Sequence, residues 1–473
     1  MTQPEQAKNV FKQIFSDGWA AFLRRYPRYA AVDEVVQKML GCGDPAKGHA
    51  LYLCPDCLER HVVAFSCKSQ FCLSCARVYG QTWVETVAEM LHPGVTYRHL
   101  ILTVPEALRT LLYQHAVPLL EGLMQAARTA MDGVVRQAKR QTVTLGYIVV
   151  LQTAGRSARY NPHLHVLMTD GGLRADGGWQ PLGYVSYDLL HRAWQEQVLT
   201  LITTLLPDDA EAIKLVTEMR RRYPRGFVAH LQGDVLPRMT QLTRYLVKYV
   251  VSPPMALSRI VAYDRACGTV RYWYRDHLSE GKRTVETVDR LTFIGRMVQH
   301  ILPKGFQRIR YYGLQAPCIL AKMRQKVVAA LQGAVQQVLA GLAAPRRRRY
   351  RERMQAMLGR DPLVCPRCGT ALWLWRVWHP RYGILYDAWG DCNSAEDVPP
   401  MSDPRDLPLD ETERAMLGLG TEVTSNYRCS RCQHEDAVPD VVIEGFAASA
   451  KLKRGRMPRL VCPLCGGPFQ ATR

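Results

Sequence analysis

Residues 161–168 read Asn-Pro-His-Leu-His-Val-Leu-Met, and this stretch decides the fold of the long middle part of the chain. Its apolar second half predicts a β-strand. Side chains two positions apart on a strand point to the same face, so His163 and His165 emerge together while Leu164 faces the core. Two neutral imidazoles side by side can hold a divalent metal ion, given one more ligand. Alone, such a histidine–hydrophobe–histidine triplet is a weak signal, because most are surface pairs.

The sequence around this strand predicts a mixed α+β fold. Helical spacing and stop signals predict helices, and runs of β-branched residues predict strands. The expected strands are 97–104, 143–152, 164–168, 260–263, 269–274 and 307–312. The expected helices are 106–140, 186–206, 238–251 and 287–302, with a turn at 170–172 after the histidine strand. An antiparallel sheet with helices on one face fits this order.

A second motif, residues 241–251, reads Gln-Leu-Thr-Arg-Tyr-Leu-Val-Lys-Tyr-Val-Val before two prolines. Gln241, Tyr245 and Tyr249 are spaced by four, so they share one face of the expected helix. Tyrosines lining a core edge would be the plain interpretation of this helix alone. Together with a two-histidine metal site, a phenol oxygen can attack a phosphorus atom whose charge the metal offsets. Lys248 would favour the phenolate or stabilise the leaving oxygen, because the unperturbed pKa of tyrosine is about 10.

Composition points to a polyanionic partner. The chain has 473 residues, which suggests about three domains, and 62 Lys plus Arg against 42 Asp plus Glu give a net charge of +20. Such an excess favours nucleic acid, because cations near phosphates release counterions. An anionic lipid partner lacks a lipidation signal or a hydrophobic anchor. The uncharged residues 327–344 contain glutamines, alanines and valines and predict a soluble helix, so no membrane partner is expected.

The cysteines predict structural zinc. There are 15, an odd number, and ten form five C-x-x-C pairs. The N-terminus has no secretion signal, so we expect a cytoplasmic protein with reduced cysteines. Four thiolates in two pairs form a closed tetrahedral site. The expected first site consists of Cys54, Cys57, Cys72 and Cys75. Nearby Cys42 and Cys67 are either buried thiols or alternative ligands.

Three more C-x-x-C pairs lie in the C-terminal part. One zinc ribbon uses two such pairs, so one pair is left over. The most natural second site consists of Cys429, Cys432, Cys462 and Cys465. Cys365 and Cys368 form a knuckle without an assigned mate, which His379 and Cys392 could complete. The pairing among these three knuckles could be permuted. All of them are expected to fold small domains around Zn²⁺ rather than to catalyse a reaction.

The expected domain boundaries follow the cysteines. Residues 1–92 form a helical N-terminus with a zinc-binding domain, and residues 93–320 form the domain with the histidines and tyrosines. Residues 321–473 form a basic linker and a C-terminal zinc-ribbon region. The linker contains Arg346, Arg347, Arg348 and Arg349, which are expected to track a DNA backbone, although a solvated linker explains them equally well.

This combination of motifs resembles the HUH single-strand nucleases, where U is a hydrophobic residue. The likeness is closest to rolling-circle transposases of bacterial insertion sequences, with Helitron transposases as distant relatives. His163-Leu-His165 matches the HUH motif, and residues 245–249 match the tyrosine helix. Residues 65–75, Phe-Ser-Cys-Lys-Ser-Gln-Phe-Cys-Leu-Ser-Cys, look like the zinc-binding domain that precedes this nuclease. The likeness covers roughly residues 40–315.

The resemblance implies a palm-like antiparallel sheet with the histidines on a central strand. It also implies nicking that depends on Mg²⁺ or Mn²⁺ and a covalent 5′-phosphotyrosine. Some relatives use two tyrosines and others one, and the spacing of Tyr245 and Tyr249 permits either. The resemblance suggests Gln241 as the third metal ligand, with Gln152 and Gln232 as alternatives.

The function expected from the sequence is therefore a transposase that nicks and rejoins single-stranded DNA of element ends and targets. A plasmid replication initiator or relaxase would use the same chemistry, but it would not rejoin element ends. A zinc-ribbon DNA-binding regulator without enzymatic activity is an alternative of another class, and it would show no metal-dependent nicking. A three-carboxylate transposase is disfavoured, since no matching acidic framework surrounds a strand and helix.

Overall fold

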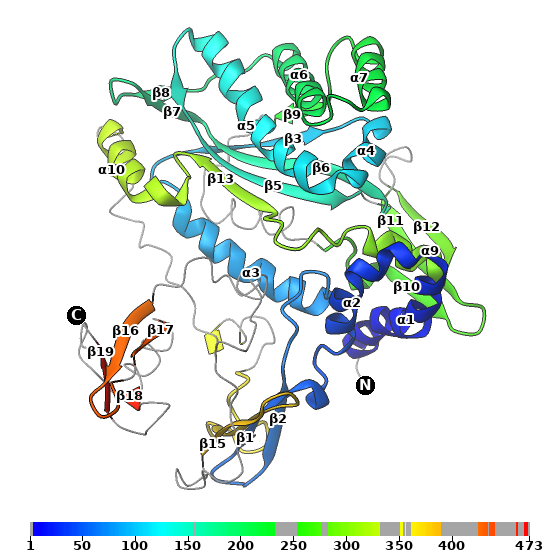
Figure 1. The fold of residues 1–473 in the computed structure, drawn as a ribbon, viewed down its shortest axis with the longest axis vertical. Helices are drawn as coiled ribbons and strands as arrows, with labels where there is room; N and C mark the ends of the chain where they lie inside the picture. Colours follow the sequence, from blue (N-terminus) through cyan, green and yellow to red (C-terminus); the bar gives the residue numbers. More distant parts are fainter. Residues whose placement is uncertain are drawn as a thin grey trace. The chain divides into compact units, whose positions relative to one another are not determined.

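The structure is a computed structural model with two compact units, Met1–Glu396 and Asp397–Arg473 (Figure 1). It describes residues 3–155, 157–231, 253–275, 282–331, 351–352, 355, 361–388, 424–433, 435–439, 460–461 and 468–471. Within this described part, no helix combines the length and the apolar character that crossing a bilayer requires.

A five-stranded sheet organises the first unit (Figure 1). Its strand order is β13-β5-β6-β3-β9, and every neighbouring pair is antiparallel. The strands are β3 (Tyr97–Thr103), β5 (Gly146–Ala154), β6 (Tyr160–Thr169), β9 (Ala229–Leu231) and β13 (Ile309–Gly313). The histidine stretch lies on β6, at the centre of the sheet. The expected antiparallel sheet is thus present, with β9 as a strand that the sequence did not reveal.

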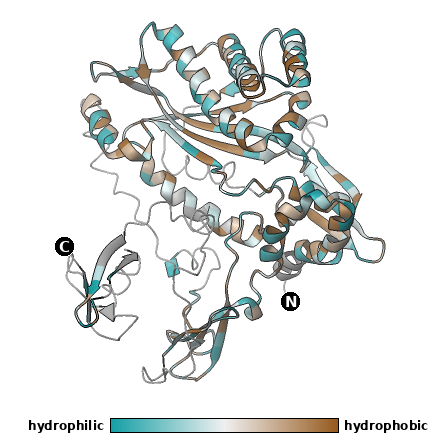
Figure 2. Cartoon of the chain, viewed as in Figure 1, coloured by the Kyte–Doolittle hydropathy of each residue, from teal (hydrophilic) through white to brown (hydrophobic). Residues whose placement is uncertain are grey.

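One face of the sheet is covered by helices and forms the largest core. Leu100, Val149, Leu164 and Val166 alternate along their strands and pack there against helical leucines and alanines. The covering helices are α4 (Arg109–Gln114), α5 (Ala116–Lys139), α6 (Tyr187–Leu205) and α7 (Ala210–Arg222). The helix expected at 106–140 is interrupted at His115, between α4 and α5. Figure 2 shows hydrophobic residues gathered along the central strands.

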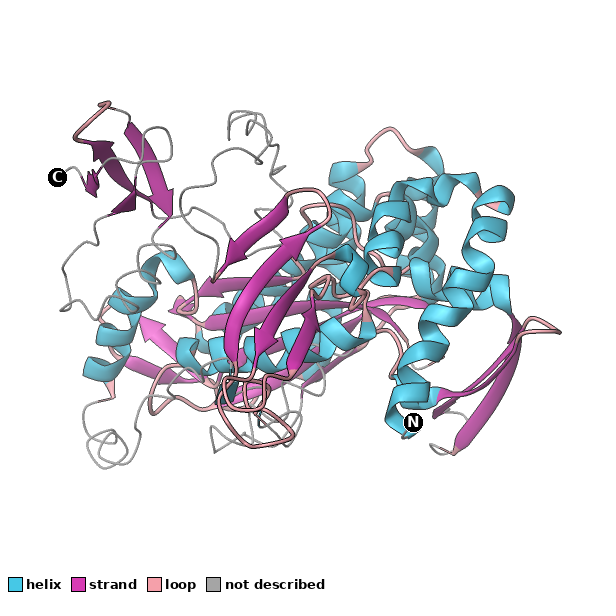
Figure 3. Ribbon diagram, turned by 90° about the horizontal axis from the view of Figure 1, so that it is seen from below, coloured by secondary structure: helices cyan, strands magenta, loops and turns pink. Residues whose placement is uncertain are grey.

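The opposite face is also covered, which corrects the expectation of helices on one face only. Helix α3 (Leu73–Met90) packs there through Trp83 and Val87 against Ile148, Val150 and other strand residues. The ribbon of α3 lies on the other side of the sheet from α5 (Figure 1), and Figure 3 shows the helices and strands of the fold from below. Apolar side chains at both alternating sets of positions on β5 explain this, because a strand buried on both faces has no polar side.

A second core joins the N-terminal helices to a three-stranded sheet. Aromatic residues of α1, including Phe15 and Trp19, are buried with Tyr272 and Phe293. The elements are α1 (Gln3–Arg25), α2 (Asp33–Leu40), β10 (Ile260–Asp264), β11 (Thr269–Arg275), β12 (Arg283–Asp289) and α9 (Arg290–Val298). The helix expected at 287–302 begins only at residue 290, because the Asp289 side chain accepts a hydrogen bond from the Thr292 N–H and caps it.

A four-stranded sheet joins segments that are far apart in the sequence. Its order is β15-β14-β1-β2, and β1 pairs with both β2 and β14. The strands are β1 (His49–Leu53), β2 (Arg60–Ala64), β14 (Trp373–His379) and β15 (Gly383–Asp387). Strands from the expected first and third domains thus share one sheet, because hydrogen bonding between strands does not depend on their distance along the chain.

Smaller elements complete the two units. The expected turn at 170–172 instead opens strand β7, because Gly171, at φ +151°, allows β6 to continue into it. The first unit also contains β4 (Val143–Thr144), β7 (Gly171–Arg174), β8 (Trp179–Pro181) and α10 (Leu320–Ala330). The second unit contains β16 (Thr424–Cys429), β17 (Glu435–Pro439), β18 (Leu460–Val461) and β19 (Pro468–Ala471), paired in the order β17-β16-β19-β18.

Candidate metal sites

His163 and His165 lie on one face of β6, as the alternation of the strand predicts. In the ladder, Gln152 of β5 lies opposite His163, and Val150 lies opposite His165. The two imidazole centres are 5.0 Å apart. His165 is 5% exposed and His163 is partly exposed, so both sit at the edge of the packed region beneath α3. Both imidazoles therefore lie next to each other on the face of the sheet that α3 covers.

Hydrogen bonds to Nδ1 orient both rings. His163 Nδ1 lies 2.7 Å from the Asn161 carbonyl oxygen, which can only accept, so Nδ1 carries the proton and Nε2 the lone pair. His165 Nδ1 lies 2.9 Å from Nε2 of His99 on β3. The rings of His99 and His165 are stacked, with centroids 5.1 Å apart. Such partners usually fix the ring orientation of metal-binding histidines. The sequence contained no motif that distinguished His99.

Burial keeps these imidazoles neutral. It lowers the pKa of His165 to about 2, with further lowering by His163, His99 and Arg308. Burial also lowers the pKa of His163, and the nearby cations Arg308 and Arg109 act in the same direction. A neutral imidazole offers a lone pair to a metal, whereas imidazolium offers none. The environment thus favours the ligand form of both side chains.

Gln152 is the third polar group at this position. It lies directly across the ladder from His163, at a Cβ separation of about 5 Å for such a pair. Its Nε2 atom is buried and has no hydrogen-bond partner among the described residues. A carboxamide next to two imidazoles suits a divalent ion, because its oxygen can be a ligand. The other expected residues of this site, Gln241, Tyr245, Lys248, Tyr249 and Gln232, lie outside the described residues.

The cysteines form two clusters, and their membership corrects the expected pairing. The first cluster is Cys42, Cys67, Cys72 and Cys75, whose sulfur atoms all lie within 4.8 Å of one another. Cys75 Sγ is 3.5 Å from Cys42 Sγ and 3.7 Å from Cys67 Sγ. Zn–S bonds of about 2.3 Å in a tetrahedron separate sulfurs by about 3.8 Å, so these distances suit zinc. The ribbon expected from Cys54, Cys57, Cys72 and Cys75 is therefore wrong in its pairing.

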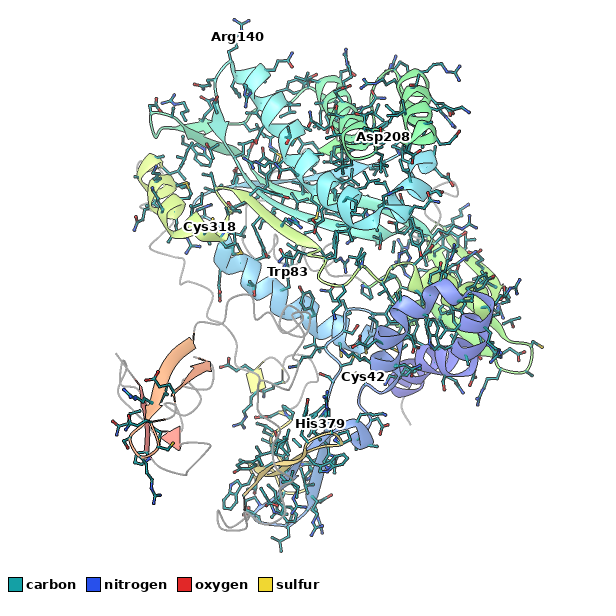
Figure 4. The ribbon with its side chains drawn as sticks, in the orientation of Figure 1. Cys42, Trp83, Arg140, Asp208, Cys318 and His379 are labelled. Atoms are coloured by element: carbon teal, nitrogen blue, oxygen red, sulfur yellow. The ribbon has the colours of Figure 1, made fainter. Side chains whose placement is uncertain are left out.

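The second cluster joins Cys54 and Cys57 to Cys365 and Cys368. Cys54 Sγ lies 3.3 Å from Cys368 Sγ, and Cys57 Sγ lies 3.6 Å from Cys365 Sγ. The pairing of β1 with β14 places the two knuckles together, which sequence spacing could not reveal across more than 300 residues. His379, on β14, is not in the cluster, and Cys392 lies outside the described residues. Figure 4 labels His379 in the small sheet and Cys42 near the start of α3.

Part of a third cysteine site is visible in the second unit. Cys429 Sγ accepts hydrogen bonds from the N–H groups of Arg431 and Cys432, as in a metal-binding knuckle. Cys429 and Leu460 both pair with Phe469 of β19, so the chain just before Cys462 runs near Cys429. Cys462, Cys465 and the arginines 346–349 lie outside the described residues, and their roles stay predictions.

Comparisons with known proteins identify the class. Residues 146–326 match the family described as "Putative transposase", and residues 14–104 match the family described as "Transposase zinc-binding domain" of the IS91 type. The first match contains both histidines of β6, and the second contains six of the clustered cysteines. The chain is thus built as a transposase with a zinc-binding domain, an enzyme class that cuts and joins DNA.

Two relatives, each matched over most of its length, agree with this class. The transposase for insertion sequence element IS801 of Pseudomonas savastanoi pv. phaseolicola is 29% identical over 78% of this chain and 89% of its own length. The "Putative transposase y4qJ" of Sinorhizobium fredii is 26% identical over 69% of this chain and 84% of its own. No solved structure matches the chain. The chain is thus similar to insertion-sequence transposases over most of its length, and its cysteine clusters fit structural zinc sites.

Proposed function

We propose that this transposase nicks and rejoins single-stranded DNA at element ends, in rolling-circle transposition, through a 5′-phosphotyrosine. The observation that carries the proposal is the pair His163 and His165 on one face of a central antiparallel strand, with their Nδ1 atoms engaged in hydrogen bonds. The antiparallel sheet, covered by helices on both faces, would serve as the palm of an HUH nuclease.

His163 and His165 would hold a divalent ion such as Mg²⁺ or Mn²⁺ through their Nε2 atoms. Gln152 is our preferred third ligand, because it lies opposite His163 in the ladder and its buried Nε2 atom has no hydrogen-bond partner among the described residues, which leaves the carboxamide available to a bound ion. Gln241, which the resemblance suggested, is the alternative. The bound ion would neutralise charge on the scissile phosphate. The described residues orient the ligands, since Asn161 and His99 hold the two rings.

The tyrosine helix would supply the nucleophile. The phenol oxygen of Tyr245 or Tyr249 gives up its proton to solvent water and forms a bond to phosphorus, while the bond from phosphorus to the 3′ oxygen breaks. The departing 3′ oxygen takes up a proton. Lys248, which directly precedes Tyr249 in the sequence, would donate this proton. Reversal of these steps with another 3′ hydroxyl releases the tyrosine and joins the new strand ends.

Trapping of the covalent adduct tests this proposal. The full-length protein is incubated with single-stranded DNA of an element end and MgCl₂ or MnCl₂, then denatured and resolved by gel electrophoresis. We expect a protein–DNA band that chelation prevents and that a Tyr245→Phe/Tyr249→Phe double variant does not form. An adduct formed by the double variant would refute the tyrosine mechanism. Nicking without rejoining of element ends would instead favour a replication initiator or relaxase.

A further inference from the structure

Two arginines, Arg308 and Arg109, belong to segments that contact the histidine strand β6 or its neighbour β5. Arg308 directly precedes β13, and its backbone oxygen accepts a hydrogen bond from the Leu151 N–H at 3.0 Å. Because Leu151 pairs with Leu164, Arg308 lies two strands from the histidine strand, about 10 Å at the usual inter-strand spacing. Arg109 begins α4, which contacts β6. Sequence patterns distinguished neither arginine.

Neither guanidinium has a carboxylate partner among the described residues. Arg308 Nε donates to the Leu151 carbonyl at 2.9 Å, and Nη1 donates to Gln70 Oε1 at 3.2 Å. Both partners are neutral, so they hold the side chain without offsetting its charge. Arg109 has a buried Nε atom without a hydrogen-bond partner in the described part of the chain. By contrast, Arg98, Arg296 and Arg310 each pair with a carboxylate.

A partly buried cation without a counter-ion is costly unless an anion completes its environment. Arg308 lies beside Leu151, whose partner in the ladder is Leu164 between the two histidines, and Arg109 begins the helix that contacts β6, so the field of both cations extends over the histidine pair. The same field opposes the entry of a bare divalent cation between the histidines. A phosphate group removes this conflict, because it is attracted both by the metal and by the guanidinium groups.

We infer that Arg308 and Arg109 form, with His163 and His165, a composite site in which a DNA phosphate and the divalent ion bind cooperatively. This inference rests on the proposed function and extends it. Each arginine is a binding residue for a non-bridging phosphate oxygen, and Gln70 is a positioning residue for Arg308. Gln70 lies between the zinc ligands Cys67 and Cys72, so the zinc-held loop supports the composite site directly.

Cooperative binding makes a prediction that a purely structural arginine does not. Binding of the phosphate must strengthen metal binding by the same factor by which the metal strengthens phosphate binding. Loss of the Arg308 charge should then have opposite effects in two conditions. Without DNA, metal affinity should stay equal or rise, because a repulsive charge is gone. With DNA, most of the gain in affinity should disappear.

The test measures the Mn²⁺ dissociation constant by electron paramagnetic resonance, with and without a 12-nucleotide oligothymidylate. The protein carries Tyr245→Phe and Tyr249→Phe in every sample so that no cleavage occurs. Titration of a His163→Ala/His165→Ala variant subtracts Mn²⁺ bound by the DNA or elsewhere. We expect the oligonucleotide to strengthen Mn²⁺ binding by about tenfold, within the usual range of coupling. Arg308→Gln and Arg109→Gln should each reduce this gain to less than about threefold.

Two further variants keep the result interpretable. Arg310→Gln is the matched control, because Arg310 lies two residues along the same strand but pairs with Glu121 at 2.6 Å; it should keep the full gain. Arg308→Lys keeps the charge and should retain more of the gain than Arg308→Gln. A full gain in both glutamine variants would overturn the inference, as would Mn²⁺ binding that DNA does not strengthen. Failure of the proposed function shows separately, as absence of the covalent adduct in protein with intact tyrosines.

Discussion

The sulfur atoms of Cys54 and Cys368 lie 3.3 Å apart, although 314 positions separate them in the sequence. This contact closes a four-thiol cluster between the hairpin β1–β2 and a knuckle that follows the whole histidine domain. Zinc bound there would hold the two segments together and would stabilise a small sheet in which Cys54 and Cys365 are buried but the strand residues are only partly covered or exposed. In such a sheet, metal binding supplies stability that apolar burial does not.

The first prediction concerns this long-range zinc site. Cys368→Ser should lose about one zinc ion per chain and should expose residues 49–64 to proteolysis, because one ligand of the tetrahedron is missing. Zinc is measured by mass spectrometry on protein purified without chelator, and wild-type chains should hold at least two ions. Cys318→Ser, an exposed cysteine outside both clusters, is the control and should keep all zinc. Unchanged zinc in Cys368→Ser would show that Cys54 and Cys57 have other partners.

The second prediction concerns the histidine pair. His163→Ala should abolish adduct formation but preserve most of the affinity for single-stranded DNA, because affinity comes mainly from dispersed phosphate contacts. Adduct yield is followed on denaturing gels and affinity by fluorescence anisotropy of a labelled oligonucleotide. Wild-type adduct rates in a His163→Ala/His165→Ala variant would contradict a catalytic metal at this position.

His99 is predicted to position His165 rather than to contact DNA. His99→Ala should weaken Mn²⁺ binding by about tenfold, since loss of such an outer partner usually costs ten- to a hundredfold. His99→Gln can still accept a hydrogen bond from Nδ1 of His165 and should restore part of the loss. His230→Gln, at an exposed position on neighbouring β9, is the control and should bind Mn²⁺ normally. If His99→Ala, His99→Gln and His230→Gln all bind Mn²⁺ with the same affinity, His99 does not position His165.

The tyrosines can be separated by single substitutions. Phenylalanine removes only the phenol oxygen, so packing is retained. If both tyrosines act, Tyr245→Phe and Tyr249→Phe should each retain some nicking of single strands but fail in complete transposition. We expect this outcome, because two phenols one helical turn apart could hold two DNA ends at one metal. If one variant forms no adduct while the other behaves normally, a single tyrosine acts.

Stability should fall in mild acid partly through His300. Burial lowers the pKa of His300 to about 4, and its ring contacts Thr153 Oγ1 and the Ala158 carbonyl. The unfolded value is about 6.5, so the unfolded chain binds the extra proton between these values. The contribution of neutral His300 to the free energy of unfolding is fully present above pH 6.5. It is lost as the pH falls toward 4, by up to about 3 kcal/mol. In His300→Gln, the drop in Tm between pH 7 and pH 5, measured by circular dichroism, should be smaller. An unchanged drop would contradict this assignment.

The sequence by itself determined the features that depend on local spacing. The two-residue period of a strand placed His163 and His165 on one face, and the structure confirms this placement. The C-x-x-C spacing predicted zinc chemistry correctly, because two thiolates three positions apart can bind one ion from a single tight turn. Helix α6 and strands β3, β5 and β11 also lie close to where local patterns predicted them.

Only the tertiary structure decided which groups meet across the chain. All C-x-x-C pairs have the same spacing, so the sequence around one pair does not indicate which other pair completes its metal site. The partners of Cys54 and Cys57 therefore depended on the pairing of β1 with β14. His99, Arg109 and Arg308 are ordinary residues in their own segments, and they reach the histidine face only because β3, α4 and β13 fold against β5 and β6. Such contacts arise from sheet register and packing, which link residues regardless of their separation in sequence. For that reason local periodicity located the histidine pair but not the residues that surround it.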